Sequence, residues 1–213
     1  MDDQPRLPAF ILRIACDIIA EEVGEEGRDI FLRRAGLERF IGNLPPKDSK
    51  APVITLEEYQ RAIATVTDVF DEDVARGIFM RAGRRAFEEV QKSEFWSFLS
   101  IPRAFASMDT KDKTVVALRR LMKDLTDFMG GEHILKKVGD DFIIEMPDCP
   151  YCVGVTSHRP VCYIPAAFYE SALQWISGRR HTVKEITCRA VGDDMCRFRI
   201  TWGVALRREQ GSA

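Results

Sequence analysis

The sequence lacks a dominant charge and a long apolar run. Its 31 basic and 33 acidic residues are interspersed and leave a formal net charge of -2, which excludes the global basic field that nucleic-acid binding requires. The most hydrophobic stretch, AFILRIACDIIA, contains Arg13 and Asp17 and cannot span a bilayer. The first residues, MDDQPRL, lack the basic segment that opens a secretory signal peptide. We therefore expect a cytoplasmic protein with no membrane span and no direct contact with nucleic acid.

The sequence also lacks a nucleotide-binding motif. No G-x-G-x-x-G follows a predicted strand, and no internal repeat or low-complexity tract is visible. Reduction of a substrate requires a hydride source, so this absence argues against an ordinary reductase. With 46% hydrophobic and 30% charged residues, the composition is that of a globular protein and not of a disordered one.

Helical periodicity dominates residues 1–130. Apolar residues recur at helical spacing in LPAFILRIACDIIAEEV, EEGRDIFLRRAGLERFI, LEEYQRAIATVTDVF, DEDVARGIFMRAGRRAFEEVQK and DKTVVALRRLMKDLTDFMGG. Gly24 separates the first two segments, and Thr55 with Glu58 predicts a capping box before the third. We expect a helical N-terminal part over residues 1–130.

The period changes after residue 131. HILKKVGDDFIIEMP predicts a hairpin, PAAFYESALQWISG a helix, and HTVKEITCRAVGDDMCRFRITW a second hairpin. This order predicts an α+β fold with a mainly antiparallel sheet over residues 131–203, continuous with the helical part. Residues 204–213 are predicted to be a polar tail.

Five of the six cysteines lie between positions 149 and 196, whereas Cys16 lies on the apolar side of a predicted helix as a core residue. A reducing compartment disfavours disulfides, so the cluster predicts metal binding or redox chemistry. A turn centred on Gly192, with the loop Val191 to Asp193, places Cys188 directly opposite Cys196. Glu185 then points to the other face of the strand, and only a bulge or a position at the strand end can bring it to the two thiols.

The residues alone leave the remaining ligand open among Cys149, Cys152 and Cys162. A redox interpretation of DCPYC requires a helix after its first cysteine, but the following VGVTSH has no helical pattern. We therefore favour zinc in a closed, four-coordinate structural site. Four thiolates drawn from the five also allow an iron–sulfur cluster.

Residues 149–200, CPYCVGVTSHRPVC through CRFRI, resemble the 4-vinyl-reductase-type domain. This family occurs in bacteriochlorophyll biosynthesis, in the sensory part of phenol- and xylene-responsive activators, and in stand-alone archaeal and bacterial proteins. The N-terminal segments EEVGEEGRDIFLRRAGLERFIGNLPP and MRAGRRAF look like the helical half of stand-alone bacterial members. The resemblance implies a fold shared with subunits of the TRAPP vesicle-tethering complex, which dimerises and holds a hydrophobic ligand near a zinc site.

The metal ligands of the aromatic-sensing members follow the pattern Cys, then Glu-x2-Cys-x7-Cys. Carried over, this pattern implies zinc ligands at Cys162, Glu185, Cys188 and Cys196. Cys149 and Cys152 are alternative ligands that would replace Cys162 or Glu185 in a purely thiolate site.

The resemblance implies a zinc-stabilised sensor or carrier for a small hydrophobic or aromatic molecule. We expect a homodimer that signals to a separate effector protein, because the sequence lacks the ATPase and DNA-binding domains of the activators. Two alternatives remain open: a tetrapyrrole 4-vinyl reductase or its accessory, and a structural adaptor like the tethering subunits. Aromatic residues that we expect to line an apolar pocket are Trp96, Phe128, Phe142, Phe168 and Trp175.

Overall fold

The computed structural model describes residues 6–47, 49–92, 96–100, 104, 106–139 and 141–203. The predicted polar tail, residues 204–213, lies outside the described residues. The helices are α1 (Ala9–Arg34), α2 (Leu56–Val69), α3 (Glu72–Gln91), α5 (Thr110–Met129) and α6 (Tyr163–Ser177), with short 3-10 turns η1 (Glu38–Phe40), η2 (Ser97–Ser100) and η3 (Arg189–Val191). The strands are β1 (Arg6–Pro8), β2 (Pro52–Thr55), β3 (Ile134–Val138), β4 (Asp141–Met146), β5 (Thr182–Thr187) and β6 (Cys196–Thr201).

The predicted helices form where the periodicity placed them, and their ends follow local chemistry. Helix α1 is interrupted at Gly24, whose φ of 78° and ψ of 175° are not helical. Thr55 caps α2 by accepting the Glu58 N–H at 3.1 Å, while the Glu58 carboxylate accepts the Thr55 N–H at 2.9 Å. Gly130 ends α5 in the left-handed conformation, which costs a glycine little.

One small sheet was not predicted. Strands β1 and β2 pair antiparallel, with Leu7 opposite Ile54, and hold the start of α1 against the start of α2. Strands of three and four residues are too short to leave a periodic signal in the sequence.

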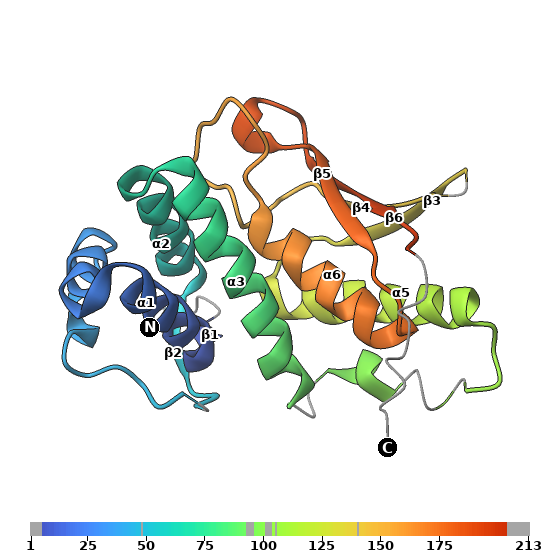
Figure 1. Cartoon of the computed structure of the whole chain (residues 1–213), viewed down its shortest axis with the longest axis horizontal. Coiled ribbons are helices and arrows are strands. Elements are labelled where there is room, and N and C mark those ends of the chain that lie inside the picture. The colour runs from blue at the N-terminus through green and yellow to red at the C-terminus, as the bar shows by residue number, and fades with distance from the viewer. Residues whose placement is uncertain are drawn as a thin grey trace, which may run out of the picture.

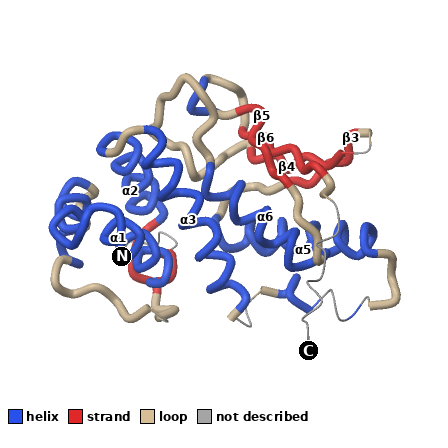
Figure 2. The backbone as a smooth tube through the Cα atoms, viewed as in Figure 1, coloured by secondary structure: helices blue, strands red, loops and turns tan. Residues whose placement is uncertain are grey.

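The main sheet has four antiparallel strands in the order β3-β4-β6-β5. It forms from the two predicted hairpins and lies at one end of the molecule, with α6 and α5 beside it (Figures 1 and 2). At its outer edge, the Val183 N–H of β5 donates to the Glu170 carboxylate of α6 at 3.0 Å. The predicted α+β class with an antiparallel sheet is therefore confirmed.

Helix α3 joins two hydrophobic cores. One core lies among α5, α6 and the main sheet, and the other lies among α1, α2 and α3. Phe87 of α3 belongs to the first core, whereas Ile78 and Phe79 belong to the second. In Figure 1, α3 runs between the N-terminal helices and α6. Among the described residues, no helix combines the length and hydrophobicity needed to cross a membrane.

Candidate metal centre and adjoining cavity

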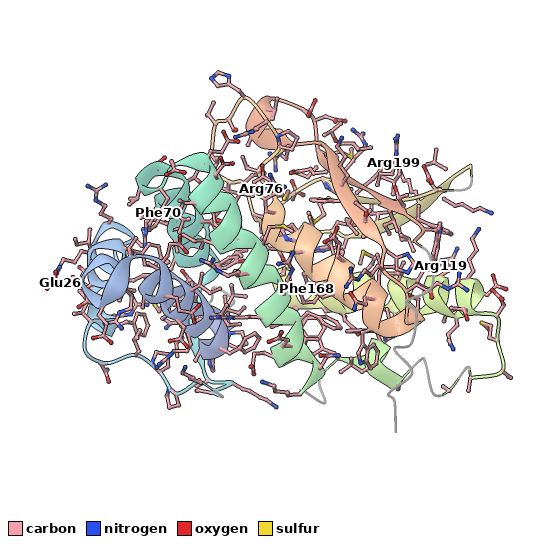
Figure 3. The ribbon with its side chains drawn as sticks, in the orientation of Figure 1. Glu26, Phe70, Arg76, Arg119, Phe168 and Arg199 are labelled. Atoms are coloured by element: carbon pink, nitrogen blue, oxygen red, sulfur yellow. The ribbon has the colours of Figure 1, made fainter. Side chains whose placement is uncertain are left out.

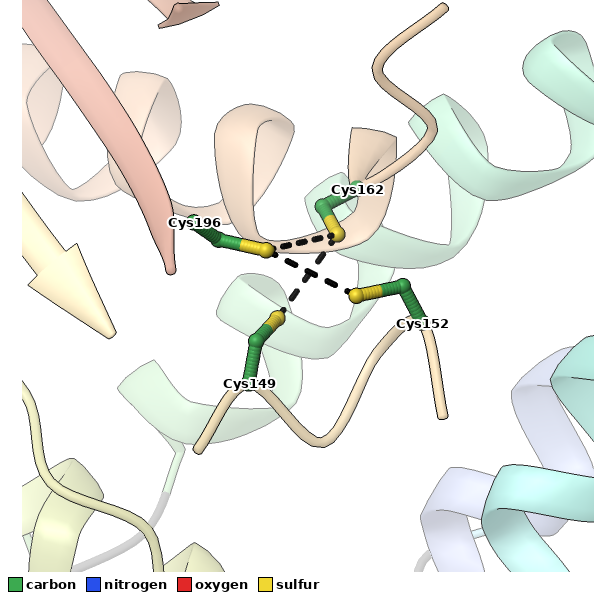
Figure 4. A group of neighbouring side chains, drawn as sticks. All are labelled: Cys149, Cys152, Cys162 and Cys196. Carbon is green, nitrogen blue, oxygen red and sulfur yellow. Dashed lines mark hydrogen bonds between the residues drawn. The ribbon is translucent and has the colours of Figure 1, made fainter. Parts of the chain in front are cut away.

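Five cysteines from four segments meet at one end of the main sheet. Cys149 and Cys152 lie in the loop between β4 and α6, and Cys162 directly precedes α6. Cys188 follows β5, and Cys196 is the first residue of β6. Their exposed fractions are between 0 and 5%. Figure 4 shows the sulfur atoms of Cys149, Cys152, Cys162 and Cys196 pointing toward a common centre.

The sulfur–sulfur distances fit tetrahedral coordination. Sγ of Cys162 lies 3.6 Å from that of Cys149 and 3.8 Å from that of Cys196, and the Cys152 and Cys196 sulfurs are 3.5 Å apart. Zinc–sulfur bonds of about 2.3 Å give a tetrahedron with edges of about 3.8 Å. The buried cysteine cluster could therefore hold a metal ion.

The donors form two overlapping sets of four. We call Cys149, Cys152, Cys162 and Cys196 the thiolate set, and Cys162, Glu185, Cys188 and Cys196 the mixed set. Within each set, the ligand atoms lie within 4.8 Å of one another. The mixed set consists of the ligands implied by the family pattern, and the thiolate set contains the two alternative cysteines. The structure thus brings all six predicted donors together without selecting one set.

A bulge carries Glu185 to the cysteines, as the sequence requires for this residue to join them. Thr187 pairs with Arg197, but the register then shifts so that Glu185 pairs with Phe198. One carboxylate oxygen of Glu185 accepts the Cys162 N–H at 2.8 Å. The other, Oε1, is buried and has no hydrogen-bond partner in the described part of the chain. Such an orphaned oxygen is the kind of group that a metal ion satisfies.

The predicted three-residue hairpin loop is wrong. Cys188 is not paired with Cys196 in the ladder, because the strand ends at Thr187 and η3 begins directly after Cys188. The Cys188 carbonyl instead accepts the N–H groups of Val191 and Asp193 at 3.0 and 3.3 Å. Gly192 does adopt a positive φ, of 104°. The wider turn places the Arg189 N–H 3.5 Å from the Cys196 sulfur, where it donates a hydrogen bond.

The electrostatics of the cluster favour a bound cation. Burial, and then the neighbouring charge of Cys188, raise the pKa of Glu185 to about 8, although the Cys162 N–H opposes the shift. Contacts with the four neighbouring thiols, together with burial, raise the pKa of Cys162 far above its usual value. The same kind of contacts lower the pKa of Cys152. Close, buried thiols cannot all ionise together unless a cation balances their charge.

An apolar cavity of about 90 Å³ lies beside this centre. Its walls come from α1, α2, α3, α5, the start of α6 and the loop after β4, and include Phe10, Ile14, Tyr59, Phe79, Met129 and Tyr151. Tyr151 stands between Cys149 and Cys152, and its ring meets that of Tyr59 edge-on with centroids 6.2 Å apart. The loop that supplies two candidate metal ligands therefore also forms part of the cavity wall.

The five aromatic residues expected at a pocket divide between two places. Trp96, Phe128 and Phe168 line the cavity, and Figure 3 shows Phe168 between α3 and α6. Phe142 instead packs edge-on against Trp202 in the main core, and Trp175 is 39% exposed beside Phe87 and Phe98. Sequence reasoning missed the contribution of α1 and of Tyr151, because helical periodicity marks a buried face without showing whether the core behind it is filled.

Comparison with known proteins identifies the segment around the cysteines. Residues 142–202 match the family model of the 4-vinyl-reductase domain. An uncharacterized protein of Methanocaldococcus jannaschii, MJ0745, is 31% identical over 58 residues, which is 27% of this chain. The match spans about a third of that relative's length, 32%.

Several solved structures share the fold. An H-NOX protein from S. oneidensis has a TM-score of 0.54 at 12% identity, with 91% of this chain and 97% of the other covered. The phenol-responsive sensory domain of the transcription activator PoxR, solved with phenol, has a TM-score of 0.53 at 14% identity, covering 71% and 76%. A trafficking protein particle complex subunit 3 from Naegleria fowleri, covalently bound to palmitic acid, has a TM-score of 0.50 at 14% identity, covering 71% and 95%.

At these identities the structural matches establish similarity of fold alone, and they agree with the fold that the sequence resemblance implied. The family match is more specific, because its segment contains Glu185 and all five clustered cysteines. The segment of residues 142–202, which builds the candidate metal centre, belongs to the 4-vinyl-reductase domain family.

Proposed function

We propose that this protein is a ligand-binding module, a sensor or carrier, in which a zinc centre supports a cavity for a small apolar or aromatic molecule. The observation that carries the proposal is the cavity itself, whose walls are hydrocarbon apart from the hydroxyls of Tyr59 and Tyr151, the Trp96 indole N–H and the Met129 thioether. An adaptor without a ligand requires no such space, because protein interiors are otherwise closely packed.

The size of the cavity favours a small ligand. Apolar cavities on the order of 150 Å³ stay dry and bind benzene, so a space of about 90 Å³ suits a single small ring after modest adjustment of its walls. A tetrapyrrole macrocycle is several times larger. The cavity thus favours a one-ring aromatic or short aliphatic ligand over the tetrapyrrole of the reductase alternative.

The polar groups of the cavity suggest one hydrogen-bonding substituent on that ligand. Burial raises the pKa of Tyr59 and Tyr151 well above the usual phenol value. Both hydroxyls therefore stay protonated and can donate a hydrogen bond to a ligand oxygen. The phenol bound by the PoxR sensory domain has this chemistry, as an aromatic ring with one hydroxyl.

Zinc fits the donor set because every candidate ligand is a thiolate or a carboxylate and the site is buried. Bound zinc would supply fixed cross-links among the loop after β4, the start of α6 and the β5–β6 hairpin. Cys162 and Tyr151 also belong to segments that line the cavity, since Ile164 and Tyr151 are both among its walls. Occupancy of the cavity is thereby coupled to the geometry of the metal centre.

The output of such a module passes to another protein. We infer a homodimer that acts on a separate effector, in keeping with the sensory role of the PoxR domain within a transcription activator. The phenol and palmitic acid held by two proteins of this fold support an apolar ligand class.

Native mass spectrometry of protein purified without added metal tests the proposal in one measurement. We expect bound zinc, a dimer mass and a copurified small molecule. Recovery of a metal-free, ligand-free monomer would overturn the proposal.

Binding of phenol and toluene, followed by calorimetry and by ¹H–¹⁵N NMR shifts, tests the cavity directly. Ala15 of α1 lines the cavity, and Ala15→Leu fills it with three added carbon atoms. Ala20 lies on the same helix outside the lining, so Ala20→Leu is the matched control. We expect Ala15→Leu to abolish binding and Ala20→Leu to retain it, and equal affinities in the two variants would contradict this location for the ligand.

A further inference from the structure

The metal centre contains more donors than one tetrahedral ion can use. Six buried ligand atoms form two sets of four, and both sets contain Cys162 and Cys196. The sulfurs of these two residues are 3.8 Å apart, which is the edge length of a zinc–thiolate tetrahedron, about 3.8 Å. The thiolate set and the mixed set thus resemble two tetrahedra that share one edge.

A single ion in either set leaves buried donors unused. An ion in the thiolate set leaves Cys188, which is 0% exposed, and the orphaned Oε1 atom of Glu185. An ion in the mixed set leaves Cys149 and Cys152, which are 0% and 5% exposed. Their sulfurs lie 3.6 Å from Cys162 and 3.5 Å from Cys196, within the distances of ligands on one ion. Neither set alone accounts for the whole cluster.

We propose that the centre binds two divalent zinc-like ions, with the Cys162 and Cys196 thiolates bridging them. Cys149 and Cys152 complete the first site, and Glu185 and Cys188 complete the second. The inference deepens the proposed function, because it rests on the same zinc centre and assigns a role to every donor.

Charge balance supports the second ion. One divalent ion among four anionic ligands leaves a net charge of -2, and two divalent ions among five thiolates and one carboxylate leave the same charge. The second ion therefore allows Glu185 and Cys188 to ionise without adding net negative charge to a buried site. The carboxylate oxygen that lacks a partner gains one as well.

The two shared cysteines occupy positions suited to bridging thiolates. Cys162 caps the N-terminus of α6, where the helix dipole stabilises negative charge. The Cys196 sulfur accepts the Arg189 N–H at 3.5 Å. Both residues adjoin regular elements, α6 and β6, so their sulfur atoms are held by the fold and not by a loop alone.

Zinc stoichiometry of the full chain, measured by native mass spectrometry after zinc loading and desalting, tests the proposal. We expect two zinc ions per chain in the unaltered protein. The variants Cys149→Ser/Cys152→Ser and Glu185→Gln/Cys188→Ser each remove the unshared ligands of one site and should each retain one ion. Cys16→Ala, which alters the cysteine outside the cluster, is the control and should retain two.

The pattern of losses separates the possible outcomes. One ion in the unaltered protein, lost completely in one double variant and kept in the other, overturns the dinuclear centre and identifies the single occupied set. No bound zinc in any protein would instead defeat the zinc part of the proposed function. Circular dichroism of each variant confirms that it is folded before its stoichiometry is compared.

Cadmium NMR provides a second test that needs no variant. Protein loaded with ¹¹³Cd should give two resonances of equal intensity, with scalar coupling between them through the shared sulfurs. A single resonance would overturn the proposal even if every double variant failed to fold.

Discussion

Gly83 lets α3 pack directly on the backbone of α6, and Gly83→Ala is expected to disturb this contact. A Cβ atom at Gly83 would overlap the carbonyl oxygen of Ile164 and lie 2.9 Å from Cβ of Ala167. Ile164 lies two residues beyond Cys162, so a retreat of α6 would displace a proposed metal ligand and the cavity wall together.

Gly77 of the same helix provides the matched control. A Cβ there has no atom within 4 Å, so Gly77→Ala should gain only helix propensity, about 0.5–1 kcal/mol. Gly83→Ala gains the same propensity and also overpacks the helix contact, which typically costs about 1–3 kcal/mol. Because the propensity terms cancel, the two variants should differ in free energy of unfolding by about 1–3 kcal/mol, with Gly83→Ala the less stable.

Urea denaturation followed by circular dichroism at a fixed zinc concentration measures this difference. For a chain of this size each kcal/mol corresponds to about 2–4 °C in Tm, so the expected gap is roughly 2–12 °C. Gly83→Ala should also weaken zinc retention, whereas Gly77→Ala should not. If Gly83→Ala proved as stable as Gly77→Ala, the close approach of α3 and α6 would be refuted.

Three further perturbations address other features. Burial lowers the pKa of His133 from 6.5 to about 4, so the folded state keeps this ring neutral. Stability that is present above pH 6.5 should fall by about 3 kcal/mol as the pH decreases from 6.5 to 4. His133→Asn should reduce this loss in urea titrations, and an unchanged pH dependence would contradict the assignment. Thr55→Ala removes the cap of α2 and should cost about 1 kcal/mol in thermal unfolding, whereas Thr55→Ser should cost little. Removal of metal with a strong chelator should lower both the Tm and the affinity for phenol, and retention of both values would show that the metal does not support the cavity.

The helices and the main sheet were predictable because their signals are local. The capping pair Thr55 and Glu58 and the break at Gly24 appear where the sequence places them. The turn after Cys188 was not predictable, because a 3-10 turn and a three-residue hairpin loop both fit the same glycine. Local chemistry leaves that choice to tertiary contacts such as the Ser157 N–H to Ala190 carbonyl bond of 2.8 Å.

The composition of the candidate centre was predictable, but its geometry was not. Residue types and spacing named all six donors, and the need for a bulge at Glu185 followed from strand alternation. The sharing of Cys162 and Cys196 between two sets depends on how the loop after β4 folds back. The cavity was also beyond reach, since it arises where residues of five helices fail to fill the space between them.

The carboxylate of Glu170 has a consequence for self-association. Strand β5 is an edge of the main sheet, and an exposed edge invites another chain to add a strand. The Val183 N–H is already occupied by Glu170, and Glu185 of the same strand is turned toward Cys162. Both carboxylates tie this edge to α6 and its first turn, so the edge is guarded against β-augmentation and runaway aggregation. A second copy of the chain must then dock through helices or through another strand.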